Sequence, residues 1–421
     1  MSNAQQGTNY VLPGGTSLSA IVPILYERRD RVAREQIGLI TAATRDATED
    51  QAALGQVVRS PVTMPATPTD IVPSNVSPYS GGQTIEYKDL VIANSKSVPV
   101  QWTGEEQRAV GGQYEKILGD QFEQSFRGVG NLIEASLVST MIAGTFTSTI
   151  NATSSVNYGG ASRAYGTAGT TPFGWSNSDY SAGMKAFGQL HLILDNNGTP
   201  EADRRLVLSQ AAFANIRALP NLYKANEAGT DQMLREGIAL QVEGFKFHKS
   251  NQLDKNKHLA GTGTGYLSDG TGAVTPSTYQ VGETSIKLKT GTGTVLAGDV
   301  VSFAGDTNLY VVGSGVSAPG TITLAQPGLQ QTLADGVAMT ITSTFTANFA
   351  LNPAALILAA RMPIMPAGGD AASDVAAVYD PVSGLTYQIA EYRQYRQIHY
   401  ETGAAWGSLA NKSEFAALLL G

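Results

Sequence analysis

The sequence predicts an α+β fold that combines one long helix, a projecting β-hairpin, and an all-β module inserted in a mixed α/β domain. Three stretches carry this prediction: a helical apolar stripe over 113–141, a proline-rich segment with β-like flanks over 55–102, and a glycine-rich, charge-poor stretch over 259–345. The chain has 421 residues, which is enough for two or three domains and a sizeable core.

The N-terminal part predicts a helix from Pro23 to about Arg45, because apolar residues recur there at helical spacing. Most of its charged residues fall on the opposite face. The arginines of that face, Arg28, Arg31 and Arg34, allow two interpretations. They form either an ordinary solvated surface or an arm that docks on a neighbouring subunit.

Residues 55–102 predict a β-hairpin that projects from the body of the protein. Prolines spread over 61–78 exclude a compact helix or a central strand in its first half. The second half becomes β-like, with Val98, Val100 and Trp102 in alternation. A hairpin cannot build a core alone, so we expect it to need a partner surface. The contact residues that we expect there are Arg59, Glu86, Lys88 and Trp102.

A long helix is predicted next. Thr103 and Glu106 have the spacing of a capping box, which indicates a helix start, and Gly111-Gly112 interrupts the helix. The apolar stripe that follows comprises Leu118, Phe122, Phe126, Val129, Ile133 and Leu137. The polar residues expected on the other side are Glu123, Arg127, Asn131 and Glu134. At 1.5 Å per residue the span 113–141 would be roughly 42 Å long.

Two glycines, Gly128 and Gly130, lie inside this helix. Each costs about 1 kcal/mol relative to alanine in an exposed helix interior. We therefore predict a hinge at this point of the helix.

The remaining chain alternates between α/β and all-β patterns. Residues 176–256 predict one α/β unit, with Ser209 and Thr230 as helix N-caps and a strand over 242–248. Short apolar runs between turn signals over 259–345 predict a barrel or sandwich. Asn352 and Pro353 then predict a helix through 362, and 380–407 predicts a turn followed by one very long strand.

The search for chemical motifs finds none. Cysteine is absent, which excludes disulfides, thiol catalysis and cysteine-ligated metals. The histidines lack metal-binding spacing: His191, His248, His258 and His399. The glycine-rich stretch 261–272 lacks the Lys-Ser/Thr pair and the helix of a phosphate-binding loop. We expect no catalytic residue, no cofactor and no metal.

Charge and hydropathy exclude further classes. The net charge of −7 argues against a dedicated nucleic-acid-binding module. No apolar run is long enough to cross a bilayer, and the N-terminus lacks the order of a signal peptide. We therefore expect a soluble protein that is made in the cytosol and has no membrane partner.

Four segments carry a resemblance to a known family: RLVLSQAAFANI at 205–216, GFKFHKSNQL at 244–253, FALNPAALILAARMP at 349–363 and DPVSGLTYQIAEYRQYRQIHYETGAAWG at 380–407. With the hairpin and the long helix, their order resembles the major capsid (coat) protein of tailed bacteriophages, the Hong Kong 97 fold. It is most similar to the short-tailed-phage (podovirus) type with an inserted β domain. The resemblance covers nearly the whole chain.

This resemblance implies a division of the chain into regions: an N-terminal arm (1–54), an extended loop (55–102), a peripheral domain with the spine helix (103–175), an axial domain in two parts (176–258 and 346–379), an inserted barrel-like β domain (259–345), and a peripheral long strand with the C-terminus (380–421). Some family members form a covalent cross-link through a lysine of the extended loop. Lys88 matches by position only, and no motif for its partner is present, so we expect no cross-link.

The resemblance also implies a function. The protein would be a structural, non-enzymatic subunit that assembles into pentamers and hexamers of an icosahedral virion shell around double-stranded DNA. Assembly would occur in the host bacterial cytoplasm with a scaffolding protein and a portal, and a decoration protein is an optional partner. DNA would be touched only non-specifically, and a later shell-wide rearrangement would bend the helix near its two glycines.

Two other classes stay open at this point. The Gly/Thr-rich module suggests a β-rich surface adhesin or binding protein, which the missing export signal and the long helix oppose. A cytosolic hydrolase with an unrecognised site would need a cleft with perturbed titratable groups.

Overall fold

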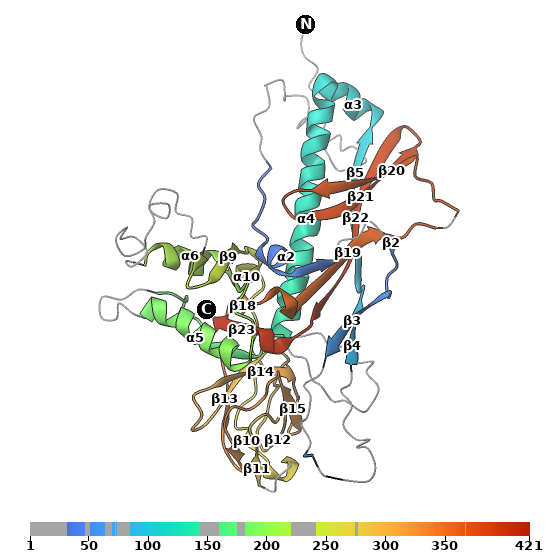
Figure 1. Cartoon of the computed structure of the whole chain (residues 1–421). Helices are drawn as coiled ribbons and strands as arrows, with labels where there is room; N and C mark the ends of the chain where they lie inside the picture. The colour runs from blue at the N-terminus through green and yellow to red at the C-terminus, as the bar shows by residue number, and fades with distance from the viewer. Residues whose placement is uncertain are drawn as a thin grey trace.

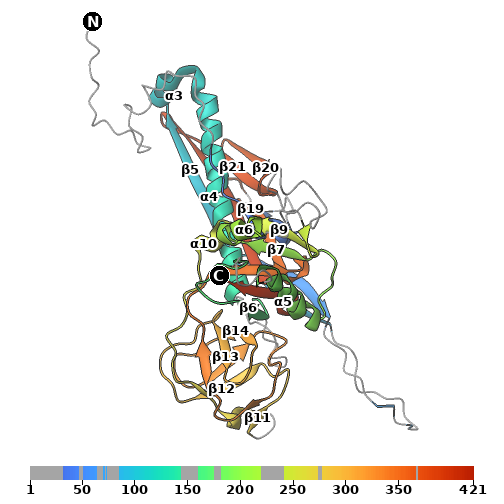
Figure 2. The same cartoon turned by 90° about the vertical axis from the view of Figure 1, so that its left-hand side faces the viewer.

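The computed structural model describes residues 32–46, 51–63, 70–71, 73, 85–143, 160–174, 182–219, 241–273, 277–366 and 368–421. Within them the chain has a mixed α+β fold (Figure 1). A long helix lies against one sheet, a second sheet carries further helices, and a lobe of short strands lies beyond the C-terminal end of the long helix (Figures 1 and 2).

The long helix is present as the sequence predicts. Helix α3 (Gly104–Val110) begins with the capping box of Thr103 and Glu106. It ends at Gly111, whose φ of 61° favours glycine. A 3-10 turn, η1 (Gly111–Gln113), leads into α4 (Tyr114–Ala143), a helix of 30 residues. The lower half of the stripe, from Val129 to Leu137, is fully buried, so the predicted period is confirmed.

One face of α4 packs on the first sheet. The strands of this sheet follow the order β1 (Thr44–Asp46), β19 (Leu356–Pro363), β22 (Gln397–Ala410), β21 (Leu385–Gln394) and β20 (Asp374–Asp380). In addition, β2 (Gln51–Ala52) pairs with β19, and β5 (Asn94–Thr103) pairs with β22. Trp102 packs edge-on against Tyr114 of the helix, and Phe126 stacks on Tyr387 of the sheet at 5.1 Å between ring centroids. The alternation of Val98, Val100 and Trp102 therefore belongs to a strand of this sheet.

Two sequence predictions fail in this sheet. The single long strand predicted over 380–407 is a hairpin of β21 (Leu385–Gln394) and β22 (Gln397–Ala410), preceded by β20 (Asp374–Asp380). The chain reverses at Tyr395-Arg396, where Arg396 has a φ of 57°. The predicted helix over 353–362 is also wrong. Asn352 does cap a turn, but it caps only η3 (Pro353–Ala355), and β19 (Leu356–Pro363) follows because both of its edges find strand partners.

The arm is not the helix that the sequence predicts. Its described part contains only α2 (Gly38–Ala42), with β1 (Thr44–Asp46) and β2 (Gln51–Ala52) after it, while 23–31 lies outside the described residues. A Cβ atom on Gly38 would lie 2.6 Å from the carbonyl oxygen of Lys249. The arm is therefore fixed by close packing on the body, and this packing overrides its local helix propensity.

The hairpin consists of β3 (Val57–Thr63) and β4 (Ile85–Val91), which pair antiparallel over seven residue pairs. Both views show it extending away from the sheet that packs on α4 (Figures 1 and 2). Its root is anchored, because Leu90 and Ile92 belong to a small apolar cluster with Ala405 and Leu409. Val62 and Lys88, farther along the hairpin, are buried as well. The hairpin is thus shorter than the predicted 55–102 segment, since 94–102 joins the sheet.

The second sheet contains twelve strands. Outside the lobe its strands follow the order β6 (Arg163–Tyr165), β23 (Ala416–Leu420), β18 (Ala347–Leu351), β7 (Arg205–Leu208), β9 (Phe245–Lys249) and, at the edge, β8 (Gln241–Val242). The helices that accompany it are α5 (Ala182–Asn196), α6 (Gln210–Arg217) and α10 (Gln252–Lys255). Ser209 caps α6 as predicted. The strand predicted over 242–248 is two strands with a turn at Glu243-Gly244, and Thr230 lies outside the described residues.

The lobe (residues 259–345) holds only short strands and one 3-10 turn among its described residues. They are β10 (Leu267–Ser268), η2 (Gly270–Gly272), β11 (Thr278–Tyr279), β12 (Ser285–Lys289), β13 (Val300–Phe303), β14 (Leu309–Ser314), β15 (Thr321–Leu324), β16 (Leu333–Ala334) and β17 (Met339–Ile341). Strand β14 pairs with β6, so the lobe continues the second sheet, and it has its own core that includes Tyr266, Phe303 and Tyr310.

Candidate functional site

An ion-pair cluster fixes the arm to the long helix. Arg127 of α4 donates from Nη2 to Oε1 of Glu35 at 2.7 Å, and the Nδ2 amide of Asn131 donates to Oε2 of Glu35 at 2.9 Å. Lys255 of α10 adds a longer contact of 3.2 Å. These hydrogen bonds, that of Arg127 first, lower the pKa of Glu35 well below its ordinary range. The arm therefore contacts the predicted polar face of the helix at Arg127 and Asn131.

Glu134 completes this attachment and corrects a sequence prediction. The sequence places it on a polar, solvated side, but its side chain is fully buried. Its two carboxylate oxygens accept the backbone N–H groups of Leu39 at 2.7 Å and Ile40 at 2.9 Å. These are first-turn groups of α2, whose N-cap residue Ile37 supplies no side-chain acceptor. Glu134 thus caps α2 from another element, and burial raises its pKa.

A third contact ties the arm to the start of the β20–β21 turn. Arg34 donates two parallel hydrogen bonds to Asp380, at 2.7 and 2.6 Å. Burial opposes ionisation of Asp380, but the bonds from Arg34 and Ser383 outweigh it and lower the pKa. Arg34 is therefore paired inside its own chain, while Arg28 and Arg31 lie outside the described residues.

Of the other predicted contact residues, Trp102 and Lys88 are buried and Arg59 is exposed. Trp102 is buried and donates to Gln121 at 2.7 Å, so its ring belongs to the core of the chain. Lys88 is only 4% exposed, and burial lowers its pKa to about 7. Arg59 is exposed, contacts Asp89 at 3.0 Å and lies over the ring of Tyr87. Glu86 pairs with Val62 through the backbone of the hairpin.

Sequence reasoning missed the apolar residues that the hairpin exposes. Ile85 is 73% exposed, and Val57 and Tyr87 are more than two-fifths exposed. The signal was present, because β4 reads IEYKDLV with Ile85 and Tyr87 on one side of the pleat. Exposed apolar side chains on a projecting two-stranded element indicate a contact surface. We call these three residues the hairpin face.

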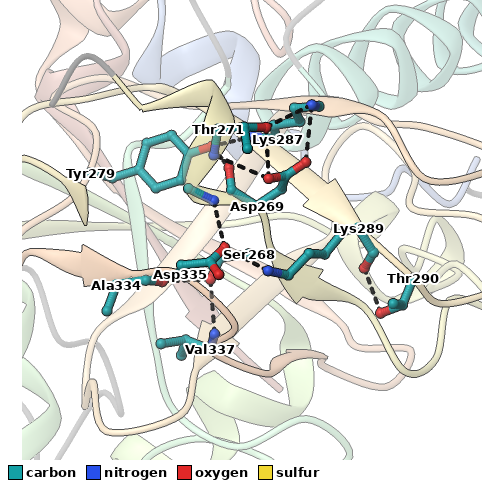
Figure 3. A network of polar contacts seen from close by, with 11 residues as sticks. Ser268, Asp269, Thr271, Tyr279, Lys287, Lys289, Thr290, Ala334, Asp335 and Val337 are labelled. Carbon is teal, nitrogen blue, oxygen red and sulfur yellow. Dashed lines mark hydrogen bonds and ion pairs between the residues drawn. The ribbon is translucent and has the colours of Figure 1, made fainter. Parts of the chain in front are cut away.

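The glycine-rich stretch 261–272 is not available for phosphate binding. Figure 3 shows Asp269 of this stretch and Asp335, which follows β16, each beside a lysine: Asp269 contacts Lys287 at 3.0 Å, and Asp335 contacts Lys289 at 2.6 Å. Asp335 also accepts the N–H of Gly270, and Asp269 accepts the N–H of Thr271. The N–H groups of 270 and 271 and both lysine charges are therefore engaged by carboxylates inside the lobe.

The predicted hinge glycines lie in a continuous helix. A Cβ atom on Gly130 would be 3.6 Å from the hydroxyl of Tyr387, and one on Gly128 would be 3.8 Å from Val98, which are ordinary contacts. Helix α4 runs through both positions, so the hinge stays a prediction. In the described part of the chain, no group of three His, Asp or Glu side chains forms a metal site. None of the described helices is long and apolar enough to span a membrane.

Comparison with known proteins adds a likeness of fold. No protein-family model and no curated protein matches the sequence. The chain is similar to a solved structure titled Mycobacterium phage Che8, with a TM-score of 0.50 and 11% identity over 94% of this chain and 95% of that chain. A capsid structure of cyanophage P-SCSP1u has a TM-score of 0.46 and 11% identity, covering 96% of this chain and 94% of that one. The asymmetric unit of the bacteriophage PhiM1 mature capsid has a TM-score of 0.45 and 10% identity, covering 94% and 90%. The likeness to the Che8 structure shows a shared fold.

Proposed function

We propose that this chain is a structural capsid protein that assembles with copies of itself into the closed shell of a tailed phage. The observation that carries the proposal is the hairpin of β3 and β4, which has a packed root and leaves the body with Val57, Ile85 and Tyr87 exposed. A hairpin of two strands gains stability only against another surface. The fold shared with a phage structure and the sequence resemblance to phage coat proteins support this conclusion.

The finer division follows from the same proposal. The chain would have the Hong Kong 97 fold of the podovirus type: arm (1–54), extended loop (55–102), peripheral domain with spine helix (103–175 and 380–421), axial domain (176–258 and 346–379) and inserted β domain (259–345). The arm contacts on α4 support an arm-and-spine arrangement. The pairing of β14 with β6 joins the lobe to the second sheet, which also contains the axial strands β7, β9 and β18.

The partners follow from the shell. Copies of the chain would meet in pentamers and hexamers through different surfaces of each copy, because heterologous contacts close into rings. A scaffolding protein and a portal would act during assembly in the host cytoplasm, with a decoration protein as an optional addition. The net charge of −7 suits a container that touches packaged double-stranded DNA only non-specifically. We propose no enzymatic activity.

Particle formation tests this function. The full chain, expressed alone and with the scaffolding protein from the same genome, is sized by sedimentation and viewed by electron microscopy. Closed shells that are much larger than any small oligomer are expected. A chain that stays monomeric under both conditions, with or without hydrolytic turnover, contradicts the proposal.

A further inference from the structure

Strand β20 (Asp374–Asp380) is an unprotected sheet edge. It is the last strand of the first sheet, and among the described residues it pairs only with β21. Its sequence is DVAAVYD, with no charge between the terminal aspartates. Residues 374–377 and Tyr379 are exposed, and Tyr379 is 63% exposed. Both faces of the strand and one backbone edge are therefore open.

Natural proteins block such edges with lysine, proline, bulges or covering elements, because an open edge pairs with other chains. Strand β5, which flanks β22 in the same sheet, carries two of these devices, Lys96 and Pro99, and α4 packs beside it. Strand β20 has no lysine and no proline. This contrast within one sheet indicates that the open edge of β20 pairs with a further strand.

The sequence of β20 also indicates what pairs with it. An antiparallel pair related by a two-fold axis must place one residue opposite itself, since opposed side chains share a face of the sheet. Centred on Ala377, the pairing sets Val375 opposite Tyr379 of the second copy and Ala376 opposite Val378. A β-branched residue opposite an aromatic is a favourable cross-strand pair, and the small central alanine leaves room for both.

The ends of the strand fit the same register. Asp374 would lie opposite Asp380 of the second copy, which would be unfavourable for two free carboxylates. Asp380, however, is buried and paired with Arg34 through two hydrogen bonds. Asp374 therefore approaches an ion pair and not a lone negative charge.

We propose that β20 pairs antiparallel with β20 of a second copy of this chain, centred on Ala377, so that the first sheets of two subunits join across a two-fold axis. This inference rests on the proposed shell, because it assigns one of the contacts between its subunits. It is an isologous contact, and it is separate from the heterologous contacts that close the rings.

Cysteine cross-linking tests the register without background, because the chain has no cysteine. In the proposed register the two Ala377 Cα atoms lie about 4.5–5.5 Å apart, inside the range of about 4.4–6.8 Å that a disulfide spans. Assembled A377C particles, oxidised and then run on a non-reducing gel, should give a dimer band for most of the chain. V375C alone should not, since the two copies of residue 375 would lie about 13 Å apart along the strands.

A mixture of V375C and Y379C chains, assembled together, should again give the dimer band. The matched control is L259C, an exposed position in the lobe, which should stay monomeric on the gel. Ala377→Lys would place two ammonium groups opposite each other, so it should weaken the contact while circular dichroism shows an unchanged fold.

The outcomes separate this inference from the proposed function. Particles that form normally but show no A377C dimer, or cross-link A377C, V375C and L259C alike, overturn the pairing of β20 and leave the shell intact. Failure of the unmodified chain to form particles overturns the shell. An A377C dimer with a silent V375C control supports both the pairing and its register.

Discussion

The arm and the hairpin are neighbouring extended segments, yet the chain treats them in opposite ways. The arm is held by its own subunit: Glu35, Arg34 and the backbone of α2 all find charged or hydrogen-bonding partners on α4 and near Asp380. The hairpin leaves the body with Ile85, Val57 and Tyr87 exposed. An extended segment can thus be stabilised by contacts within its own chain, as the arm is, or leave apolar side chains exposed for a partner, as the hairpin does.

The difference separates the roles of ion pairs, which fix the arm, from those of exposed apolar side chains, which the hairpin carries. The charged groups of the arm form ion pairs with residues of the same chain. The position of the arm therefore does not depend on a partner. The hydrophobic effect at the hairpin is non-directional, and its favourable free energy grows with the apolar area that a partner buries. We infer that the arm sets the shape of the subunit, whereas the hairpin supplies the energy of association.

The largest effect is expected when the hairpin face is made polar. Ile85→Asp should leave the free energy of unfolding of the isolated chain within about 0.5 kcal/mol, because the side chain is exposed. It should reduce particle yield by at least about tenfold, since a buried carboxylate at a contact costs more than about 1.4 kcal/mol. Sedimentation of assembly reactions measures the yield.

The matched control is Val281→Asp, at an exposed apolar position on the lobe. It should change neither the unfolding free energy nor the yield. If Ile85→Asp assembles as well as the Val281→Asp variant, the hairpin face is not a contact between copies, and the comparison with the arm loses its basis.

The second largest effect concerns the arm. Glu134→Ala removes the acceptor of two buried backbone N–H groups, those of Leu39 and Ile40. The free energy of unfolding should fall by about 2–4 kcal/mol, because each buried donor loses its partner. Urea denaturation measures this loss, and limited proteolysis should show earlier cleavage near residues 38–46. Glu115→Ala, on the exposed first turn of the same helix, should be nearly silent. Equal stability of the two variants would falsify the role of Glu134 as a cap.

The arm should make two opposite contributions to the pH dependence of the free energy of unfolding. The pKa of Glu35 is lowered in the folded chain, so its contribution is complete above the ordinary value of about 4.5 and is lost as the pH falls. The pKa of Glu134 is raised by burial, so its contribution is complete below about 4.5 and is lost as the pH rises through the raised value.

Two variants separate these contributions in unfolding curves measured between pH 3 and 8. Glu35→Gln should remove part of the stability loss on the acid side, and Glu134→Gln should remove part of the loss on the alkaline side. Unchanged slopes in both variants would show that neither carboxylate links arm attachment to pH.

The sequence was sufficient where the signal is local. The capping boxes and caps at Thr103, Ser209 and Asn352 use side chains within three residues of their targets, and all three are found. The stripe of α4 is equally local. The same local rules fail for the run after Asn352, because an apolar stretch of seven or eight residues suits a buried strand as well as a helix.

Other failures come from contacts between distant parts of the chain. Residues Arg127, Asn131 and Glu134 share one face of α4, and nothing in the helix itself indicates that an arm from about 95 positions earlier will cover that face. The reversal at Tyr395-Arg396 lacks glycine, asparagine and proline, so no turn signal divides β21 from β22. All of the candidate contact residues except Trp102 were charged, whereas the hairpin also exposes the apolar side chains of Val57, Ile85 and Tyr87.

The smallest expected effect tests whether α4 itself can move. Gly128→Ala with Gly130→Ala adds methyl groups where neighbouring atoms lie at ordinary contact distance, so the static fold should accept both. Helix stability should rise by at most about 1 kcal/mol per site. If the spine helix bends there during a shell-wide rearrangement, the double variant should assemble normally but expand more slowly or form shells of altered angularity. Electron microscopy of particles before and after expansion measures both the rate and the angularity. Particles identical to the unmodified ones would show that α4 does not bend at these glycines. Any movement would then have to come from other segments, such as the hairpin.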